Sequence, residues 1–418
     1  MQLSKLGLKL TAGAGIVRLM DDLGEAAAGR PDMAMLGGGN PGRIPEVESR
    51  LRARMQRILA DGDTFERLIG AYDSPQGPAD FVRAVASLLR RELGWPVHPE
   101  NIAVTNGSQS ASFMLFNLLG GEALDGTHRR IFLPLTPEYV GYADQGVTDG
   151  LFVSRRPEIE LLDDRLFKYR VDLRGLEMPE DVAAVCVSRP TNPTGNVLTD
   201  DEVAALAELA ASRDVPLIID SAYGLPFPGI VFRDATPHWN ERTVVCMSLS
   251  KIGLPGVRTG IVVAAPEMVR ALVGMNAIVN LTTGGFGPAL ALDMIRDGEI
   301  LRLARDVVRP FYQGRAEMAV DLLRHELDGL DFWIHRPEGA IFLWAWFRDL
   351  PITSDTLYRR LKDRGVLVLS GHHFFPGLEG AWRHRDECVR INCSQSTEMV
   401  QRGLRVLCEE VRRAYGEG

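Results

Sequence analysis

Four short segments of the chain carry polar side chains that could together form one chemical site. Two of them follow apolar, strand-like runs: LIIDSAY contains Asp220 and Tyr223, and SLSKIGLPGVRTG contains Lys251 and, seven residues later, Arg258. A carboxylate at the end of a buried strand is costly unless it meets a cation, such as a protonated ring nitrogen. A lysine among cations in a desolvated pocket has a lowered pKa and can form Schiff bases.

The other two segments could supply a phosphate cradle and an amide. In NGSQSASFMLFNLLGG a Gly-Ser turn opens an apolar helix, and the free N–H groups and positive dipole of a helix start favour an anion. In PTNPTGNVLT, Asn192 is placed to point a carboxamide toward the sheet edge where α/β proteins bind ligands. Each motif alone is also typical of a plain structural turn or cap. All four in this order provide what a pyridoxal-5′-phosphate (PLP) site needs.

The elements that must position these residues alternate between strands and helices. The expected strands are Ile102–Thr105, Ile131–Leu135, Leu151–Ser154, Ala183–Ser188, Leu217–Asp220, Val244–Ser248 and Gly260–Ala264. Asp200–Arg213 is expected to be a helix, because apolar residues recur at helical spacing and Thr199 with Glu202 can form a capping box. This alternation predicts an α/β fold with a mostly parallel sheet that is covered on both faces.

The C-terminal part of the chain has a different pattern. Gly339–Phe347 and Val366–Leu369 are expected to be strands, with a helix over Asp355–Arg364, which predicts a separate, smaller α+β domain. The glycine-rich stretch Gly37–Pro45 is typical of a hinge or binding loop. We expect an N-terminal segment, residues 1–45, that joins the small domain, a large PLP-binding domain over 46–310 and a small C-terminal domain over 311–418.

Composition limits the partners of the chain. The 418 residues carry a net charge of −8, from 47 basic and 55 acidic side chains that are well mixed, so we expect neither nucleic acid nor membrane as a partner. The chain has no long apolar window and its five cysteines form no CxxC pair, and we expect no cleaved signal peptide. We expect a cytoplasmic protein with reduced cysteines and no metal site, in which His372 and His373 are loop residues.

The motifs NPTG, D-x-A-Y and S-x-S-K-x(6)-R occur in this order and are followed by R-I-N at Arg390–Asn392. In these motifs the chain resembles the fold-type I PLP-dependent aminotransferases of class I/II, the aspartate aminotransferase superfamily, over nearly its whole length. The resemblance implies a large domain with a mainly parallel seven-stranded sheet and a smaller α+β domain.

The resemblance also implies roles for individual residues. Lys251 would carry the cofactor as a Schiff base and then act as the base for the proton shift. Asp220 would pair with the pyridinium nitrogen, while Tyr223 and Asn192 would hydrogen-bond the phenolate oxygen of the ring. The remaining cofactor contacts would come from Ser108, Gln109, Ser248, Ser250 and Arg258 at the phosphate, from Tyr139 or alternatively Tyr142 stacked on the ring, and from Tyr72 of the neighbouring subunit.

For the substrate, the resemblance implies that Arg390 binds the α-carboxylate bidentately, assisted by Asn192 and by a backbone contact from Gly38 or Gly39. The partners would be small amino acids and 2-oxo acids, and the assembly would be a homodimer with shared active sites. Longer strings, among them LGGGNP, TNGSQSA and PEGAIFLW, resemble more narrowly the bacterial valine–pyruvate aminotransferases. This implies that valine and pyruvate give 3-methyl-2-oxobutanoate and alanine.

Several alternatives remain open from the sequence. The apolar side-chain pocket has only candidate residues, namely Ile16, Leu19 and Ile278. The enzyme could prefer alanine, other branched-chain or aromatic donors, or it could be a C–S lyase or decarboxylase on the same fold. A PLP-binding transcription regulator would need an added basic domain, for which we expect no room before the GGGNP loop. A non-catalytic relic is disfavoured because Lys251, Asp220 and Arg390 are all present.

Overall fold

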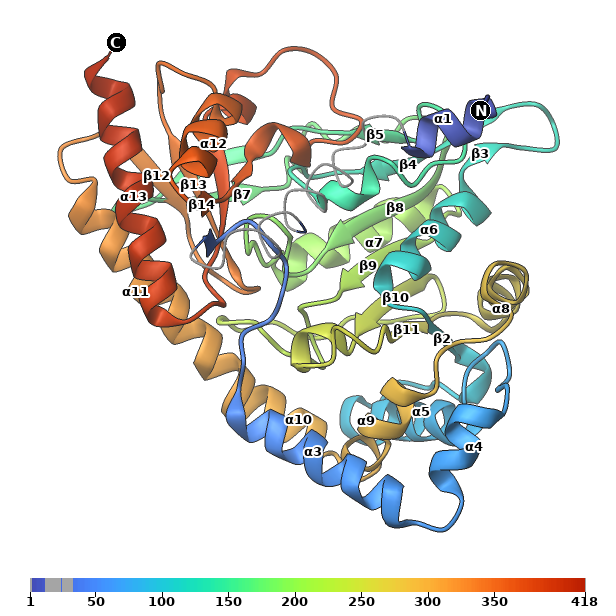
Figure 1. Cartoon of the computed structure of the whole chain (residues 1–418). Helices are drawn as coiled ribbons and strands as arrows, with labels where there is room; N and C mark the ends of the chain where they lie inside the picture. Colours follow the sequence, from blue (N-terminus) through green and yellow to red (C-terminus); the bar gives the residue numbers. More distant parts are fainter. Residues whose placement is uncertain (1, 12–23, 25–32, 418) are drawn as a thin grey trace.

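A mixed sheet forms the centre of the larger part of the molecule (Figure 1). The computed structural model describes residues 2–11, 24 and 33–417. The strand order is β2 (Ile102–Thr105), β11 (Gly260–Val263), β10 (Thr243–Ser248), β9 (Leu217–Ser221), β8 (Val182–Ser188), β4 (His128–Leu133) and β3 (Gly121–Glu122), and β5 (Phe152–Ser154) also pairs with β4. All seven expected strands lie in this sheet, and β3 is an additional two-residue strand at its edge.

Most of the sheet is parallel. β10, β9, β8, β4 and β5 run in one direction, whereas β11 is antiparallel to both of its neighbours, β10 and β2. β3 is antiparallel to β4. The expectation of a mainly parallel α/β sheet is therefore confirmed, with antiparallel pairs confined to β11 and the β3 edge.

Helices cover both faces of this sheet because its strands are apolar on both sides. On one face, α6 (Ser108–Leu119) and α8 (Pro266–Asn280) pack on a cluster that includes Cys186 and Cys246. On the other face lie α5 (Ala79–Leu93), α9 (Phe286–Arg296) and α7 (Asp200–Ser212). The expected capping box of Thr199 and Glu202 opens α7.

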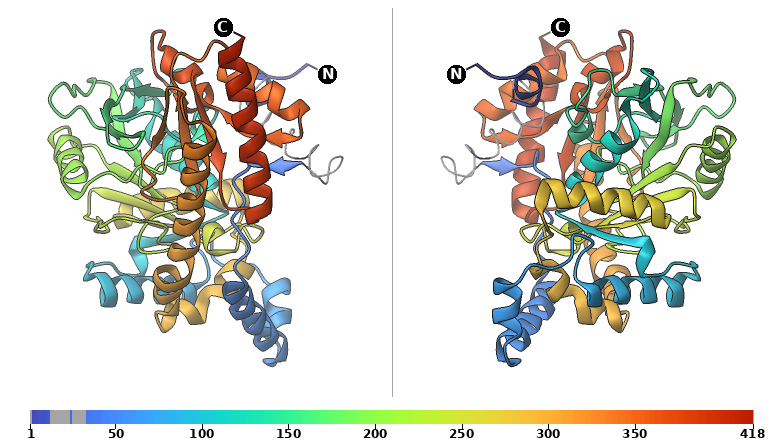
Figure 2. Two further views of the ribbon diagram at one scale, coloured as in Figure 1. Left: turned by 90° about the vertical axis from the view of Figure 1, so that its left-hand side faces the viewer. Right: turned by 90° about the vertical axis from the view of Figure 1, so that its right-hand side faces the viewer.

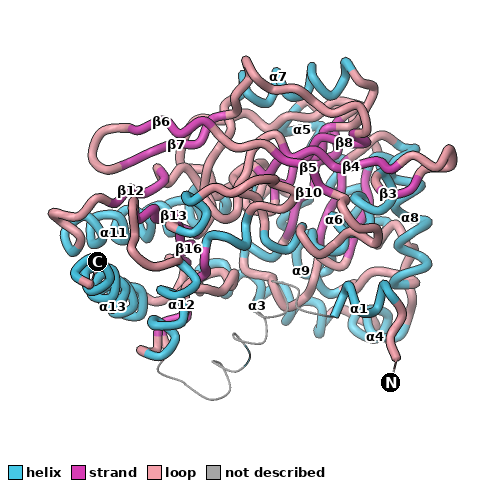
Figure 3. The backbone as a smooth tube through the Cα atoms, turned by 90° about the horizontal axis from the view of Figure 1, so that it is seen from above, coloured by secondary structure: helices cyan, strands magenta, loops and turns pink. Residues whose placement is uncertain are grey.

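A second sheet organises the C-terminal part. Its order is β15 (Leu369–Ser370), β16 (Cys388–Asn392), β13 (Phe342–Phe347), β12 (Phe332–His335), β7 (Leu166–Arg170) and β6 (Glu158–Leu161). Its helices are α11 (Arg309–Glu326), α12 (Ser354–Asp363) and α13 (Thr397–Gly416), and Figure 2 shows α11 and α13 side by side. The β6–β7 hairpin comes from the middle of the chain, yet it pairs with β12 (Figure 3).

Two expected strands differ from the structure. The run Val366–Leu369 is not one strand: β14 (Val366–Leu367) pairs with β1 (Ala34–Met35), whereas β15 belongs to the second sheet. The strand expected from Gly339 begins only at Phe342. The residues before Phe342 form a turn instead, since Ala340 has a φ of 60°. Gly339 packs so closely on Pro190 that a Cβ on Gly339 would lie 2.7 Å from the proline ring.

Four further α-helices lie in the described part of the chain. They are α1 (Lys5–Thr11), α3 (Pro45–Ala60), α4 (Thr64–Gly70) and α10 (Glu299–Leu303), which continues through a π-helical turn, Ala304–Val308, into α11. In the described part of the chain, no helix is both long enough and apolar enough to cross a membrane.

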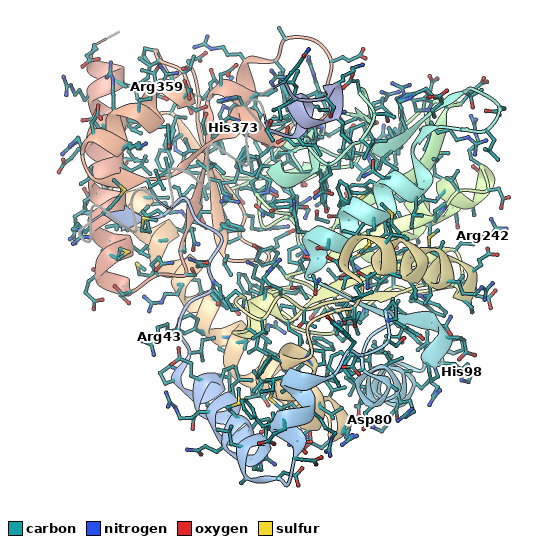
Figure 4. All side chains as sticks on the ribbon, turned by 45° about the vertical axis from the view of Figure 1, so that its right-hand side comes forward. Arg43, Asp80, His98, Arg242, Arg359 and His373 are labelled. Carbon is teal, nitrogen blue, oxygen red and sulfur yellow. The ribbon has the colours of Figure 1, made fainter. Side chains whose placement is uncertain are left out.

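The outside of the molecule carries charges of both signs. Arg43, Asp80, Arg242 and Arg359 lie at the surface in Figure 4. Arg43 pairs with Glu48 at 2.8 Å, in a position open to solvent. Exposed pairs of this kind contribute little to stability, so the buried apolar clusters hold the fold together.

Candidate active site

The ends of four strands meet at one edge of the large sheet. β8, β9 and β10 are parallel, and β2 runs the same way because two antiparallel pairings through β11 separate it from β10. Strands that run in one direction end at the same edge. Asn192 after β8, Asp220 at the end of β9 and Lys251 after β10 therefore face the start of α6, which follows β2.

Lys251 lies in a single 3₁₀ turn, Ser250–Ile252, which begins two residues after the end of β10. Its Nζ donates a hydrogen bond to the backbone oxygen of Gly39 at 2.6 Å. The same atom lies 5.2 Å from the centre of the Tyr223 ring. The amine thus sits between the glycine-rich loop and the aromatic ring that follows β9.

The surroundings of Lys251 disfavour its charged form. Burial lowers the pKa of Lys251 to about 8, with Arg390 and Arg258 acting in the same direction and Asp220 against them. A lysine with this pKa has a substantial neutral fraction near physiological pH, and the neutral amine can attack a carbonyl carbon. Lys251 therefore has the properties of a Schiff-base lysine.

The carboxylate of Asp220 has no cation at hydrogen-bond distance among the described side chains. Its Oδ2 accepts from the hydroxyl of Tyr142 at 2.6 Å, and its Oδ1 accepts from the backbone N–H of Ala222 at 2.9 Å. Burial raises the pKa of Asp220, and these two hydrogen bonds oppose that rise. A protonated pyridine nitrogen is the kind of cation that would keep the carboxylate ionised.

The two candidate stacking tyrosines have different environments. Tyr142 is 1% exposed and its hydroxyl is bound to Asp220. Tyr139 is only half-buried, and its ring stands at 88° to that of Tyr142. A Cβ on Gly141 would lie 2.4 Å from the Tyr139 ring, so the glycine leaves room for this ring position. These contacts favour Tyr139 as the ring that faces a ligand.

An anion site lies at the start of α6. Gly107, just before Ser108, has a φ of 89°, and a Cβ there would lie 2.3 Å from Nη2 of Arg258. Nη1 of Arg258 reaches Oγ of Ser250 at 3.5 Å and the backbone oxygen of Pro255 at 3.2 Å. No carboxylate of the described residues pairs with Arg258. Its positive charge and the N-terminus of α6 therefore act on the same space.

Two more predicted residues lie beside this candidate anion site. Oε1 of Gln109 is buried and has no hydrogen-bond partner in the described protein. The hydroxyl of Ser248 accepts from the backbone N–H of Ser250 at 3.1 Å and so shapes the turn before Lys251. A phosphate oxygen accepts hydrogen bonds, as this amide oxygen does, so a bound phosphate would be contacted through the Nε2 donor of Gln109.

Arg390, in β16, is 2% exposed. Its Nη1 donates to Oδ1 of Asn192 at 2.8 Å, and its Nη2 donates to the backbone oxygen of Gly37 at 2.6 Å. The guanidinium carbon lies 4.1 Å from the centre of the Phe342 ring and 5.2 Å from that of Phe374. Burial lowers the pKa of Arg390 to about 10, so it stays charged at neutral pH. No carboxylate of the described chain pairs with this guanidinium, so it is suited to bind the carboxylate of a ligand.

The glycine-rich loop contacts three site residues through successive carbonyl groups. The carbonyl of Gly37 accepts from Arg390, and that of Gly38 accepts from Nδ2 of Asn392 at 2.6 Å. The carbonyl of Gly39 accepts from Lys251. The sequence predicted that Gly38 or Gly39 gives a backbone contact to the substrate carboxylate, which is a different role. It did not single out Gly37 or Asn392, although Asn392 stands in the R-I-N motif.

Some predicted residues lie apart from this cluster. Tyr72 is 83% exposed and Ile278 is 88% exposed, so within one chain neither lines the site. Ile16 and Leu19, the other two candidates for the side-chain pocket, lie outside the described residues.

Glu138 is a buried carboxyl group that sequence reasoning missed. Its Oε1 accepts from the backbone N–H of Ser188 at 2.8 Å, and its Oε2 contacts the hydroxyl of the same serine. Burial raises the pKa of Glu138 to about 8. The available signal was an acidic residue within the otherwise uncharged run IFLPLTPEYV, directly before Tyr139.

Comparison with known proteins agrees with this geometry. The family model for aminotransferase class I and II matches residues 49–407. A valine–pyruvate aminotransferase of Escherichia coli K12 is 48% identical over 417 residues, which cover 100% of both chains. Among solved structures, a valine–pyruvate aminotransferase of Salmonella typhimurium LT2 is 47% identical, with a TM-score of 0.89 over 97% of this chain and 100% of that one. A putative amino-acid aminotransferase of Psychrobacter arcticum 273-4 is 44% identical, with a TM-score of 0.97 over 100% of both chains.

The described residues fit the PLP that this family uses. They offer an amine of lowered pKa, a buried carboxylate without a cation and an uncompensated guanidinium at a helix start. These groups match the carbonyl, ring nitrogen and phosphate of the cofactor. The chain therefore belongs to the class I and II aminotransferases and is a PLP-dependent enzyme of that family.

Proposed function

We propose that this aminotransferase moves the amino group between a small aliphatic amino acid and a 2-oxo acid, with valine and pyruvate as its substrates. The observation that carries this specificity is the 48% identity, over the whole chain, with the valine–pyruvate aminotransferase of Escherichia coli. The aromatic rings of Phe342 and Phe374 beside Arg390 agree with it, since an apolar substrate needs an apolar surround.

The residues of the site divide the chemistry between them. When bound, PLP supplies the electron sink that lets the substrate α-carbon lose its proton. Lys251 would bind the cofactor, and its Nζ would then take up that proton. Asp220 would hold a proton on the ring nitrogen, while Tyr142 holds Asp220 in place. Ser108, Gln109, Ser250 and Arg258 would bind the phosphate.

Substrate binding would rest on Arg390. Both half-reactions bring a carboxylate to the same guanidinium, so the amino acid and the oxo acid must use one pocket in turn. Asn192 and Gly37 hold two of the guanidinium nitrogens and thereby fix its plane. Neighbouring subunits would share sites, because Tyr72 is too exposed to serve its own chain. The five free and buried cysteines are typical of a cytoplasmic enzyme, which is the compartment that we propose.

A substrate panel tests this proposal. Single half-reactions with valine, alanine, leucine, aspartate and glutamate are followed through the absorbance of the bound cofactor. We expect valine and alanine to react efficiently and the dicarboxylates poorly. Among the described residues, the guanidinium groups that act on Lys251 are those of Arg390 and Arg258. These would bind the α-carboxylate and the phosphate, which leaves neither for a side-chain carboxylate. Equal rates with aspartate and valine would contradict the aliphatic specificity. Release of ammonia or a thiol without any oxo acid would point to a lyase instead.

A further inference from the structure

A buried ionic cluster lies next to the loop that carries Asn192. Lys168, in β7, pairs with Glu338, and their side chains are 0% and 3% exposed. The other oxygen of Glu338 accepts from Arg233 at 2.9 Å and from Arg336 at 2.7 Å. Burial alone would raise the pKa of Glu338, but Lys168 and the nearby His335 bring it down to about 2. Glu338 is thus ionised at every pH at which the enzyme would work.

The cluster is bonded directly to the loop, residues 190–197. Besides Glu338, Nζ of Lys168 donates to Oδ1 of Asn196 at 2.8 Å and to the backbone oxygen of Val197 at 3.1 Å. Glu338 also accepts from the backbone N–H of Val197 at 3.0 Å. All three protons of the Lys168 ammonium are therefore used, two of them on the loop.

The loop is consequently held at two points by the second sheet. Near its start, Asn192 accepts from Arg390 of β16, and at its end Asn196 and Val197 bind the Lys168–Glu338 pair. The two points are coupled through the loop backbone, because the backbone N–H of Thr191 donates to the backbone oxygen of Asn196 at 2.8 Å. A shift at Asn196 must then move the residue next to Asn192.

Close packing leaves the loop little freedom in between. Gly195 has a φ of 72°, and a Cβ there would lie 2.6 Å from the backbone oxygen of Gly339, the residue after Glu338. The contact between the loop and the Glu338 segment is therefore backbone against backbone. Small displacements of one would be passed to the other rather than absorbed by side chains.

We propose that the Lys168–Glu338 pair positions the loop so that Asn192 holds the Arg390 guanidinium in the plane needed to bind a substrate carboxylate. This inference rests on the proposed role of Arg390 in substrate binding. Replacing a buried ion pair by apolar groups is often neutral for stability, so such a pair is poorly explained by stability alone. Lys168 is a positioning residue here, because its hydrogen bonds go to Glu338 and to the loop residues Asn196 and Val197.

The variant Lys168→Met tests the proposal in the PLP-loaded enzyme. Glu338 keeps Arg233 and Arg336 as partners, so no unpaired carboxylate is left. We expect the KM for the amino acid and for the oxo acid to rise together by about tenfold or more, with kcat changed less, because Lys251 is untouched. The dissociation constant of 3-methylbutanoate, a carboxylate that cannot react, should rise by a similar factor, and amide hydrogen exchange in residues 190–197 should become faster.

Glu410→Gln is the matched control. Glu410 is also buried and ion-paired, to Arg364 at 2.9 Å, but it lies in α13 and contacts no residue of the loop. We expect it to lower the unfolding temperature without changing KM, the binding of 3-methylbutanoate or exchange in the loop. This separates the loss of a buried pair from the loss of loop positioning.

The proposal is overturned if Lys168→Met lowers the unfolding temperature while KM, 3-methylbutanoate binding and loop exchange all stay at the parent values. Should Lys168→Met not fold, Asn196→Ala removes one loop contact and must show the same rise in KM, and an unchanged KM would overturn the proposal equally. Failure of the proposed function would show itself differently, since the parent enzyme would then not react with valine. The Lys168 comparison would remain valid with whichever amino acid the panel identifies.

Discussion

Burial lowers the pKa of the Lys251 amine most, and two guanidinium groups reinforce this effect. Arg390 and Arg258 act on Lys251 with the same sign as its burial, and Asp220 acts against them. Among the described residues, neither of these two cations is paired with a carboxylate. The charge that would bind the substrate carboxylate and the cofactor phosphate therefore also favours the neutral form of the reactive amine.

This arrangement predicts a pH effect of Arg390→Met. In the cofactor-free parent enzyme, the rate of covalent PLP capture should rise with pH and level off above about 8, where Lys251 loses its proton. Because Arg390 lowers the pKa of Lys251, its removal should raise that pKa and move the midpoint of the rate profile to higher pH. Stopped-flow absorbance at a series of pH values measures this. An unchanged midpoint would contradict the coupling between the two side chains.

At the scale of single residues, the sequence predicted the functional side chains at the strand ends but not the residues that hydrogen-bond to them or to their strands. Lys251, Asp220 and Asn192 follow strands that periodicity identifies, so their convergence could be inferred. Tyr142 was proposed only as a stacking ring, and its hydrogen bond to Asp220 spans 78 residues of sequence. Glu138 gave almost no signal. Its partner, Ser188, is the last residue of β8 and lies 50 residues further along the chain, so only the tertiary fold brings the two together.

Among the elements, the turn before α6 is the most constrained. Gly107 combines a positive φ with a position where any Cβ would meet the Arg258 guanidinium. The helix start can approach a phosphate only because this residue has no side chain. The α6 turn is therefore the structural element on which cofactor retention should depend most.

We predict that Gly107→Ala weakens PLP binding while the chain still folds. The dissociation constant of PLP should increase by about tenfold or more, because an alanine at this φ costs about 1–2 kcal/mol and displaces Arg258. Equilibrium dialysis against PLP measures the change. Gly126→Ala is the control, since Gly126 also has a positive φ, 78°, but a Cβ there would meet no described atom within 4 Å. Equal losses in the two variants would assign the effect to backbone strain alone.

The β6–β7 hairpin shows where element prediction from the sequence ended. Strand and helix periodicity indicated the large sheet, the capped α7 and the order of the C-terminal elements. The hairpin strand β7, however, pairs with β12 across more than 160 residues, and nothing local specifies that partner. The division of Val366–Leu369 between two sheets was equally hidden, because it depends on β1 pairing with β14.

At the scale of the whole molecule, exposed apolar and aromatic side chains point to assembly. Tyr72 is 83% exposed and Ile278 is 88% exposed, although both residue types are usually at least partly buried. A homodimer would cover them and would place each near the site of the other chain. The side-chain pocket could then be completed only by two subunits.

Hybrid dimers test whether subunits share sites. When a Tyr72→Phe chain is mixed with a Lys251→Ala chain, the hybrid has one Lys251-bearing site, whose partner provides an intact Tyr72. We expect this site to have parent activity. When the double variant Tyr72→Phe/Lys251→Ala is mixed with parent chain, the Lys251 site of the hybrid lacks the tyrosine, and its PLP affinity should fall. Equal activity of the two purified hybrids, or a fully active monomer at high dilution, would contradict shared sites.

The central claim is that Lys251 is the residue through which this enzyme carries PLP. Borohydride reduction of the loaded enzyme, followed by digestion and mass spectrometry, locates the lysine that holds the cofactor. The account predicts that the label lies on the peptide containing Lys251, and that Lys251→Ala folds but takes up no label. A label on any other lysine, or continued labelling of Lys251→Ala, would contradict it.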